Sequence, residues 1–236
     1  MVSAARSPRE LDAMVDRRVA GLPLEQVLGW AEFCGLRIAV DPGVFVPRRR
    51  TEFLVRQAGA LARPGDVIVD LCCGAGAIGA ALAAVVDGAE VHAVDIDPAA
   101  VRCARQNVPG AVYEGDLYEP LPGGLRGRVG ILVANVPYVP TGEIRFLPPE
   151  ARAHEPLTAL DGGPDGLDVL RRVAGAASGW LAPGGYLLIE TSDRQAPRAA
   201  AAFADSGLTP RVASSADLDA TVIIGRRCSD AGEDRT

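Results

Sequence analysis

"VIVDLCCGAGAIGAALA", residues 67–83, joins an apolar strand to a helix through a glycine-rich turn and decides the fold. The first five residues are a short, largely β-branched run of the kind that forms a buried strand. Gly74, Gly76 and Gly79 match the pattern G-x-G-x-x-G, which permits a tight turn and a close approach of the backbone to a ligand. The stretch predicts the first strand, loop and helix of a nucleoside-binding sheet.

Apolar runs of the same kind recur along the chain, with helical patterns between most of them. Strands that alternate with helices imply a parallel sheet covered on both faces. The predicted strands are DVIVDL (66–71), EVHAVD (90–95), AVYEGD (111–116), VGILVAN (129–135), GYLLIE (185–190) and ATVIIGR (220–226).

The amino-terminal part precedes this periodic core. Ser7, Pro8 and Glu10 form a capping box that predicts one helix, ending before Pro23, as the only helix ahead of the first extended segment. Residues 32–45 predict a short hairpin, and the amphipathic pattern that follows predicts a helix. The chain is therefore expected to be one α/β domain with a small helical extension.

Composition excludes several classes of protein. With 236 residues and 48% hydrophobic residues, the chain can bury a sizeable core. Its net charge of −6 gives no general attraction for a phosphate backbone, so nucleic acid is not the expected partner. An odd set of five cysteines without C-x-x-C spacing, and only two histidines, predicts no disulfide framework and no metal site. No signal peptide or membrane span is expected, which favours a cytoplasmic protein.

Acidic residues end three of the predicted strands, and they help to decide which ligand the glycine loop binds. A dinucleotide and S-adenosylmethionine both fit G-x-G-x-x-G. Asp70 would repel a pyrophosphate by about 4 kcal/mol at ~4 Å with an effective dielectric near 20, and it suits an ammonium or sulfonium instead. Asp95 can accept both ribose hydroxyls of either ligand. Asp116 can accept the adenine amino group, or it caps a turn.

Two short groups near the loop carry competing interpretations. Cys72 and Cys73 are adjacent, a spacing that strains a disulfide, so small residues beneath a ligand are favoured over a redox pair. In the run PRRRTE, Arg49 and Arg50 are interpreted as a solvated helix start, and Arg48 is left open.

The turn after the fourth strand predicts the reaction. Asn135 should face the ligand, because the fourth strand of such a sheet ends beside the first loop. The Asn135 side-chain oxygen and the Val136 carbonyl are two acceptors, and Pro137 fixes the turn that aims them. Tyr138 can lay its ring against a flat group. The four residues therefore look like a clamp for a planar NH2 group, which predicts N-methylation.

These motifs together resemble the protein-(glutamine-N5) methyltransferase family, whose best known members act on the glutamine of peptide chain release factors. The similarity runs from about residue 24 to 226 and rests on VFVPRRRTE, DLCCGAGAIG, AVDID, EGDLYEP, ANVPY and HEPLTAL. It implies a class I S-adenosylmethionine-dependent methyltransferase fold, Rossmann-like, with a seven-stranded, mostly parallel sheet whose last strand is antiparallel. The implied domains are a short helical extension (1–30), the methyltransferase domain (31–227) and a disordered tail (228–236).

The resemblance also implies roles for individual residues. The clamp residues Asn135, Val136, Pro137 and Tyr138 would hold the acceptor amide. The residues implied to bind S-adenosylmethionine are Asp70, Cys72, Cys73, Gly74, Ala75, Gly76, Asp95, Ile96, Asp116, Leu117 and Asn135.

Two departures bear on the acceptor. The family pattern N-P-P-Y is here N-V-P-Y, which keeps the carbonyl at Val136 but frees its φ. Only some twenty residues precede LPLEQVLGW, fewer than the docking domain of typical members, so an acceptor other than a release factor stays open. The alternatives are a small-molecule amide or amine, adenine N6, a nicotinamide oxidoreductase and a silent nucleoside-binding regulator. Glu155 and Pro156 either line the acceptor entrance or form a structural turn.

Overall fold

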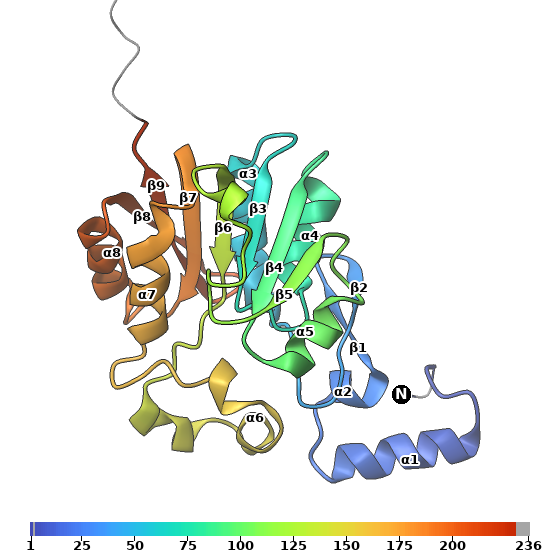
Figure 1. Ribbon diagram of the computed structural model, residues 1–236. Coiled ribbons are helices and arrows are strands. Elements are labelled where there is room, and N and C mark those ends of the chain that lie inside the picture. The colour runs from blue at the N-terminus through green and yellow to red at the C-terminus, as the bar shows by residue number, and fades with distance from the viewer. Residues whose placement is uncertain (2, 230–236) are drawn as a thin grey trace, which may run out of the picture.

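A seven-stranded sheet in the order β5-β4-β3-β6-β7-β9-β8 forms the centre of the molecule (Figure 1). The computed structural model describes residues 1 and 3–229. Neighbours from β5 to β7 are parallel, whereas β9 is antiparallel to both β7 and β8. The predicted class I fold is confirmed. The strands are β3 (Val67–Leu71), β4 (Glu90–Asp95), β5 (Ala111–Glu114), β6 (Val129–Ala134), β7 (Leu181–Thr191), β8 (Leu208–Ser215) and β9 (Ala220–Arg227).

Helices cover both faces of the sheet, which explains why the central strands are mostly apolar, with Asp70 of β3 a buried exception. All five residues of β3 are buried; Ile68 packs on one face, and Val67 and Val69 pack on the other. The first face carries α3 (Glu52–Leu61), α4 (Ala77–Val85) and α5 (Pro98–Ala104), and the second carries α7 (Asp168–Ala177) and α8 (Ala196–Asp205).

The amino-terminal segment follows the sequence-based expectation in part. Helix α1 (Pro8–Val19) begins after Ser7, whose hydroxyl accepts from the Glu10 N–H at 3.2 Å. A second helix, α2 (Leu24–Leu28), was not expected, because five residues are too few to show a helical period. The hairpin of β1 (Trp30–Phe33) and β2 (Leu36–Ala39) turns at Cys34 and Gly35, both at positive φ.

Strand β8 was missed in the sequence because it lies at the edge of the sheet. Only Leu208 of its eight residues is buried, and Pro210 interrupts the pattern. An edge strand needs no continuous apolar run, since it has one neighbour. Most of the tail predicted from residue 228 lies outside the described residues.

A segment without strands follows β6 and leaves the sheet at its carboxyl edge. It contains η3 (Thr141–Phe146), α6 (Pro149–His154) and η4 (Leu157–Ala159), and lies below the sheet in Figure 1. The remaining short elements are η1 (Arg49–Thr51) and η2 (Gly123–Leu125). None of the helices in residues 1 and 3–229 has the length and apolar character needed to cross a membrane.

Candidate active site

A cavity of about 560 Å³ lies at the carboxyl ends of β3, β4 and β6. This is where the strand order reverses, the usual ligand position in open α/β sheets. The segment after β6 forms its roof, contributing Leu147, Pro148 and Glu155. Of the residues expected at the site, the cavity wall includes Cys72, Cys73, Gly74, Ala75, Asp95, Ile96, Asn135, Val136, Pro137 and Tyr138. Asp70, Gly76, Asp116 and Leu117 lie outside that wall.

The loop between β3 and α4 is fixed by the carboxylate of Asp95. Its Oδ2 accepts from the Gly74 N–H at 2.8 Å and its Oδ1 accepts from the Asp97 N–H at 2.9 Å. Burial raises the pKa of Asp95 above its ordinary value, although these backbone hydrogen bonds work in the opposite direction. Gly76 has φ +76°, and a Cβ there would stand 2.5 Å from Val108 Cγ2. A Cβ on Gly79 would stand 3.2 Å from Asp70 Oδ2, a tight contact.

Asp70 lies beneath the loop and is fully buried. Its Oδ2 accepts from the Gly79 N–H at 2.9 Å, while its Oδ1 has no partner among the described residues. Burial raises the pKa of Asp70 to about 7, and the charge of Asp95 adds to this rise. In this structure Asp70 therefore holds the start of α4 and contacts the loop from below.

Asp116 and Leu117 stand to one side of the cavity. The Asp116 carboxylate pairs with Arg172 of α7 at 2.6 Å, and Leu117 is nearly buried with φ +51°. Positive φ in a leucine is uncommon and marks a sharp turn here. The turn after β5 is thus tied to the helix layer on the second face of the sheet.

The two adjacent cysteines are free thiols. Cys72 has φ +55° and lines the cavity with Cys73. Burial raises the pKa of both thiols far above the ordinary range, and neighbouring Asp95 and Asp70 reinforce the shift. A thiolate is disfavoured at either position, which agrees with small wall residues better than with redox chemistry.

The turn at residues 135–138, called the acceptor turn from here on, presents unpaired acceptors. Asn135 Nδ2 donates to Thr51 Oγ1 at 3.4 Å, while Asn135 Oδ1 is buried and has no partner within the described chain. Val136 is 1% exposed, and none of the hydrogen bonds among the described residues ends on its carbonyl. Buried acceptors without partners are rare in native proteins, so this pair points to a donor supplied by a ligand.

Tyr138 forms the far side of the turn, and an ion pair between the exposed Arg50 and the buried Glu190 lies behind it. Its hydroxyl contacts Arg50 Nη2, and Arg50 Nε lies 3.0 Å from Oε1 of the buried Glu190. Burial raises the pKa of the Tyr138 phenol. Arg49 and Arg50 are both exposed and belong to η1 at the start of α3, as interpreted from the sequence, but the Arg50 guanidinium also contacts Tyr138 and Glu190.

A second ion pair, between Arg48 and Glu155, joins two parts of the cavity wall. Arg48 Nη2 lies 2.5 Å from Glu155 Oε1, and the Glu155 side chain is only 1% exposed. Burial raises the pKa of Glu155, and the positive charge of Arg48 opposes this shift. Both Glu155 and Pro156 line the cavity, so this segment forms part of its wall.

Three residues near the acceptor turn were missed from the sequence: Thr51, Glu190 and Gln195. Glu190 stands at the end of β7, and an acidic strand end was the signal that singled out Asp70 and Asp95. Thr51 belongs to the quoted PRRRTE run. Gln195 carries no recognisable pattern, since it lies in the short loop between β7 and α8 and belongs to no motif.

Known proteins resemble this chain along most of its length. A family model described as the methyltransferase small domain matches residues 35–143. A release factor glutamine methyltransferase from Geobacter sulfurreducens is 40% identical over 209 residues, covering 85% of this chain and 72% of that protein. One from Mycolicibacterium smegmatis is 41% identical, covering 87% and 74%. A 4-amino-L-phenylalanine/4-methylamino-L-phenylalanine methyltransferase from Streptomyces pristinaespiralis is 38% identical, covering 82% and 69%.

Solved structures share the fold at low sequence identity. A methyltransferase from Pyrococcus furiosus superposes with a TM-score of 0.62 at 16% identity, covering 92% of this chain and 98% of that one. A 16S rRNA N2 G1207 methyltransferase from T. thermophilus, in complex with AdoMet and guanosine, gives 0.60 at 21%, covering 84% and 49%. These likenesses concern the fold alone.

Proposed function

The chain belongs to the release factor glutamine methyltransferase family, and we propose that it transfers a methyl group from S-adenosylmethionine to the side-chain amide nitrogen (N5) of a glutamine in a protein such as a peptide chain release factor. The observation that carries the proposal is the acceptor turn. There, the buried Asn135 Oδ1 and the Val136 carbonyl, neither of which has a hydrogen-bond partner in the part of the chain that the structure describes, supply two acceptors, the number that an NH2 group requires.

The cavity beside the turn fits the methyl donor. Ile96 is 55% exposed although it is a large apolar residue, and its place on the cavity wall suits the flat face of an adenine. Asp95 has lone pairs left for ribose hydroxyls beyond its two backbone hydrogen bonds. When bound, S-adenosylmethionine supplies a methyl group carried on a positively charged sulfur. We propose the cofactor-binding role of these residues on this basis.

The acceptor turn acts on an amide nitrogen, which is a poor nucleophile because its lone pair is delocalised into the carbonyl. Hydrogen bonds from both N–H groups to Asn135 Oδ1 and the Val136 carbonyl favour positive charge on that nitrogen as the new C–N bond forms. Pro137 and Tyr138 hold the planar group in line, and positioning of this kind lowers barriers by about 7–11 kcal/mol. The nitrogen loses one proton after the transfer, so no residue need act as a base beforehand.

A polar hollow of about 310 Å³ lies behind Tyr138 and supports a peptide as the acceptor. Arg50 and Tyr138 line both the hollow and the main cavity. The hollow adds the hydroxyls of Thr191 and Thr221 and the carboxylate of Asp219. Hydroxyl, carboxylate and guanidinium groups match the N–H and C=O groups of a main chain on either side of an inserted side chain.

We propose the cytoplasm, where release factors act, as the place of the reaction.

A second acceptor class is favoured by one specific observation. The relative from Streptomyces pristinaespiralis, which is 38% identical, is named for an aromatic amine on a free amino acid. Charged groups of both signs in the polar hollow, including Arg50 and Asp219, would also suit a free α-carboxylate and α-ammonium.

Transfer of labelled methyl groups tests the two classes. The enzyme is incubated with labelled S-adenosylmethionine and either a bacterial release factor or 4-amino-L-phenylalanine, and the modified site is mapped by mass spectrometry. Methylation of one glutamine, lost when that glutamine is replaced by alanine, supports the proposal. Label on the free amino acid alone would favour the second class. The Asn135→Ala enzyme serves as the inactive control for both acceptors.

A further inference from the structure

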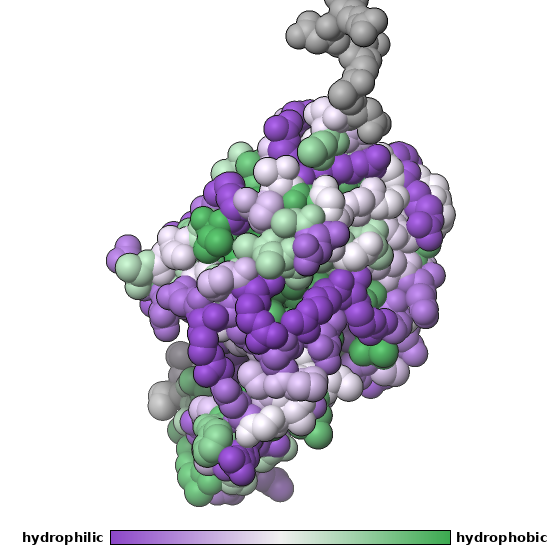
Figure 2. All heavy atoms as spheres, turned by 90° about the vertical axis from the view of Figure 1, so that its left-hand side faces the viewer, coloured by the Kyte–Doolittle hydropathy of each residue, from purple (hydrophilic) through white to green (hydrophobic). Residues whose placement is uncertain are grey.

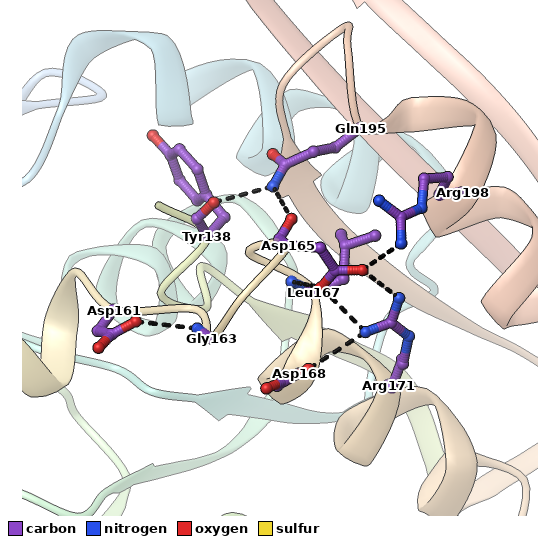
Figure 3. Close-up of polar contacts among 9 residues, drawn as sticks. All are labelled: Tyr138, Asp161, Gly163, Asp165, Leu167, Asp168, Arg171, Gln195 and Arg198. Atoms are coloured by element: carbon purple, nitrogen blue, oxygen red, sulfur yellow. Dashed lines mark hydrogen bonds and ion pairs between the residues drawn. The ribbon is translucent and has the colours of Figure 1, made fainter. Parts of the chain in front are cut away.

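Gln195 is a buried amide that touches the acceptor turn without lining the main cavity. It is 6% exposed and stands just before α8. Its Nε2 donates to the Tyr138 carbonyl at 2.9 Å and to the Asp165 carbonyl at 3.1 Å (Figure 3). Its Oε1 accepts from the Ser192 hydroxyl at 2.7 Å, which fixes the orientation of the amide. One side chain thus joins the turn to a second loop far along the sequence.

That second loop, residues 161–168, encloses the exit of the acceptor turn. The Val139 N–H donates to the Leu160 carbonyl at 3.0 Å, and the Gly162 N–H donates to the Val139 carbonyl at 2.9 Å. A Cβ on Gly166 would stand 2.2 Å from the Tyr138 carbonyl oxygen, so the two backbones meet where only glycine fits. The exit of the turn is therefore held from several sides.

The loop is itself anchored to α7 and α8. Both carboxylate oxygens of Asp165 contact Arg171, at 3.0 and 2.6 Å, and Arg198 also contacts Oδ2 (Figure 3). These side-chain hydrogen bonds to Arg171 lower the pKa of Asp165 to about 2. Figure 2 shows the face that carries these helices, crossed by a band of hydrophilic side chains. Gln195 thus bonds to a residue, Asp165, that is itself held in place by Arg171 and Arg198.

The acceptor turn gains from such support because no proline ring fixes φ of Val136, whose side chain is packed in the core. Pro137 restricts its own φ, and Asn135 is held by Thr51 at the entry. Val136 is not a proline, and the hydrogen bonds of the described residues include none donated by its N–H. Rotation about φ of Val136 would swing its carbonyl away from the acceptor nitrogen unless the exit of the turn is fixed.

We propose that Gln195 is a positioning residue that holds the Tyr138 and Asp165 carbonyls together, and so aims the Asn135 and Val136 acceptors at the amide nitrogen. The inference rests on the proposed function, since it takes the turn as the acceptor site. Gln195 supplies through two hydrogen bonds the rigidity that a proline at residue 136 would supply through its ring.

Kinetics of Gln195→Leu, with and without Val136→Pro, test the inference. The single variant should lose about 10²-fold in kcat, the size expected for a misplacement near 1 Å, while its Kd for S-adenosylmethionine stays within twofold. Adding Val136→Pro should restore at least tenfold of that loss, because the ring fixes φ at this position. An equal loss in the single and double variants, or an unchanged kcat in Gln195→Leu, would overturn the proposal.

A matched control separates positioning from general destabilisation. Tyr118 also donates from a buried side chain to a main-chain carbonyl, that of Val173 in α7 at 2.8 Å, but it belongs neither to the acceptor turn nor to residues 161–168. Tyr118→Phe should lower the melting temperature about as much as Gln195→Leu does. Unlike Gln195→Leu, it should not make kcat depend on whether Val136→Pro is also present. Gln195→Asn, which only withdraws the donors by one methylene, replaces Gln195→Leu if the latter does not fold.

Hydrogen–deuterium exchange gives a readout that does not depend on the acceptor. The Val139 and Thr141 amides donate to the Leu160 and Gly163 carbonyls, and both should exchange at least tenfold faster in Gln195→Leu. Val136→Pro should reverse that acceleration, and Tyr118→Phe should not cause it. If release factors are not methylated but this pattern holds, the proposed function fails and the role of Gln195 stands. Unchanged exchange at both amides would refute that role.

Discussion

The two halves of the active site are built in different ways. The cofactor half is one continuous strand–loop–helix–strand unit, in which Gly74 and Asp95 are joined by a hydrogen bond across 21 positions of sequence. The acceptor half joins segments that are far apart: Asn135 contacts Thr51 across 84 positions, and Arg50 contacts Glu190 across 140. One half is encoded by a local pattern of glycines and acidic strand ends, and the other by packing.

The two halves also differ in the position of a buried side-chain oxygen that has no partner among the described residues, Asp70 Oδ1 in one and Asn135 Oδ1 in the other. Asp70 Oδ1 lies under the glycine loop, outside the cavity wall, where it can receive no ligand without movement of the loop. Asn135 belongs to the cavity wall, so its Oδ1, which has no partner among the described residues, is placed to meet a donor from a ligand. The first is therefore expected to control the stability of the loop, and the second the chemistry.

The largest effect is expected at the acceptor half. Asn135→Ala removes one of two acceptors for the NH2 group, and loss of one such preorganised group lowers kcat by about 10²–10³-fold. The Kd for S-adenosylmethionine, measured by calorimetry, should change only a few-fold. If Asn135→Ala retains the wild-type kcat, the acceptor turn has no role in methyl transfer, and the division into a cofactor half and an acceptor half fails.

Asp95→Ala tests the cofactor half, where the expected effect is on the Kd for S-adenosylmethionine and not on kcat. A hydrogen bond to a charged group contributes about 1.5–3 kcal/mol, so the Kd for S-adenosylmethionine should rise roughly 10- to 150-fold. At saturating cofactor, kcat should recover most of its wild-type value, since the acceptor turn is intact. The measurement is a titration followed by initial rates at high cofactor concentration. A loss confined to kcat would contradict the assignment of Asp95.

Asp70→Asn should change the pH dependence of stability. The folded pKa of Asp70 is about 7 against an ordinary value of 3.8, so the folded state holds its proton over a range where the unfolded state has lost it. Stability in the wild type is therefore lost as pH rises from about 4 through about 7. The asparagine variant has no such loss, and its advantage should grow by about 2 kcal/mol between pH 5 and pH 7.

Urea unfolding of the cofactor-free proteins at several pH values measures this difference. Asp12→Asn is the control, because Asp12 is exposed on α1 and should leave the pH profile as in the wild type. Parallel profiles for Asp70→Asn and the wild type would show that the buried carboxyl titrates normally.

The smallest effect is expected at Asp116. Its carboxylate already pairs with Arg172 and stands outside the cavity wall, so Asp116→Asn should raise the cofactor Kd by less than about fivefold. Unfolding should change little, because both partners are partly exposed. A rise as large as that of Asp95→Ala would place Asp116 in direct contact with the adenine and extend the cofactor half to the end of β5.

Much of the fold was readable from sequence for a physical reason that also explains the misses. Strands buried on both faces, such as β3 and β6, are apolar at almost every position, and this pattern is visible without knowledge of any neighbour. The edge strand β8 is mostly exposed, so its sequence need not differ from that of a loop. Likewise, the ion pair of the exposed Arg50 was not predicted, because nothing nearby in sequence foretells the buried carboxylate of Glu190.

The sequence by itself determined the parallel sheet and the glycine loop with its acidic strand ends, and it predicted that residues 135–138 hold an acceptor amide. These follow from short-range rules: backbone angles allowed to glycine and proline, and the alternation of strands with helices. Only the tertiary structure decided that Asp70 lies below the loop, that Arg50 joins Tyr138 to Glu190, and that Gln195 ties the acceptor turn to residues 161–168. Contacts across such distances depend on how helices and loops pack on the sheet, and no local pattern specifies that packing.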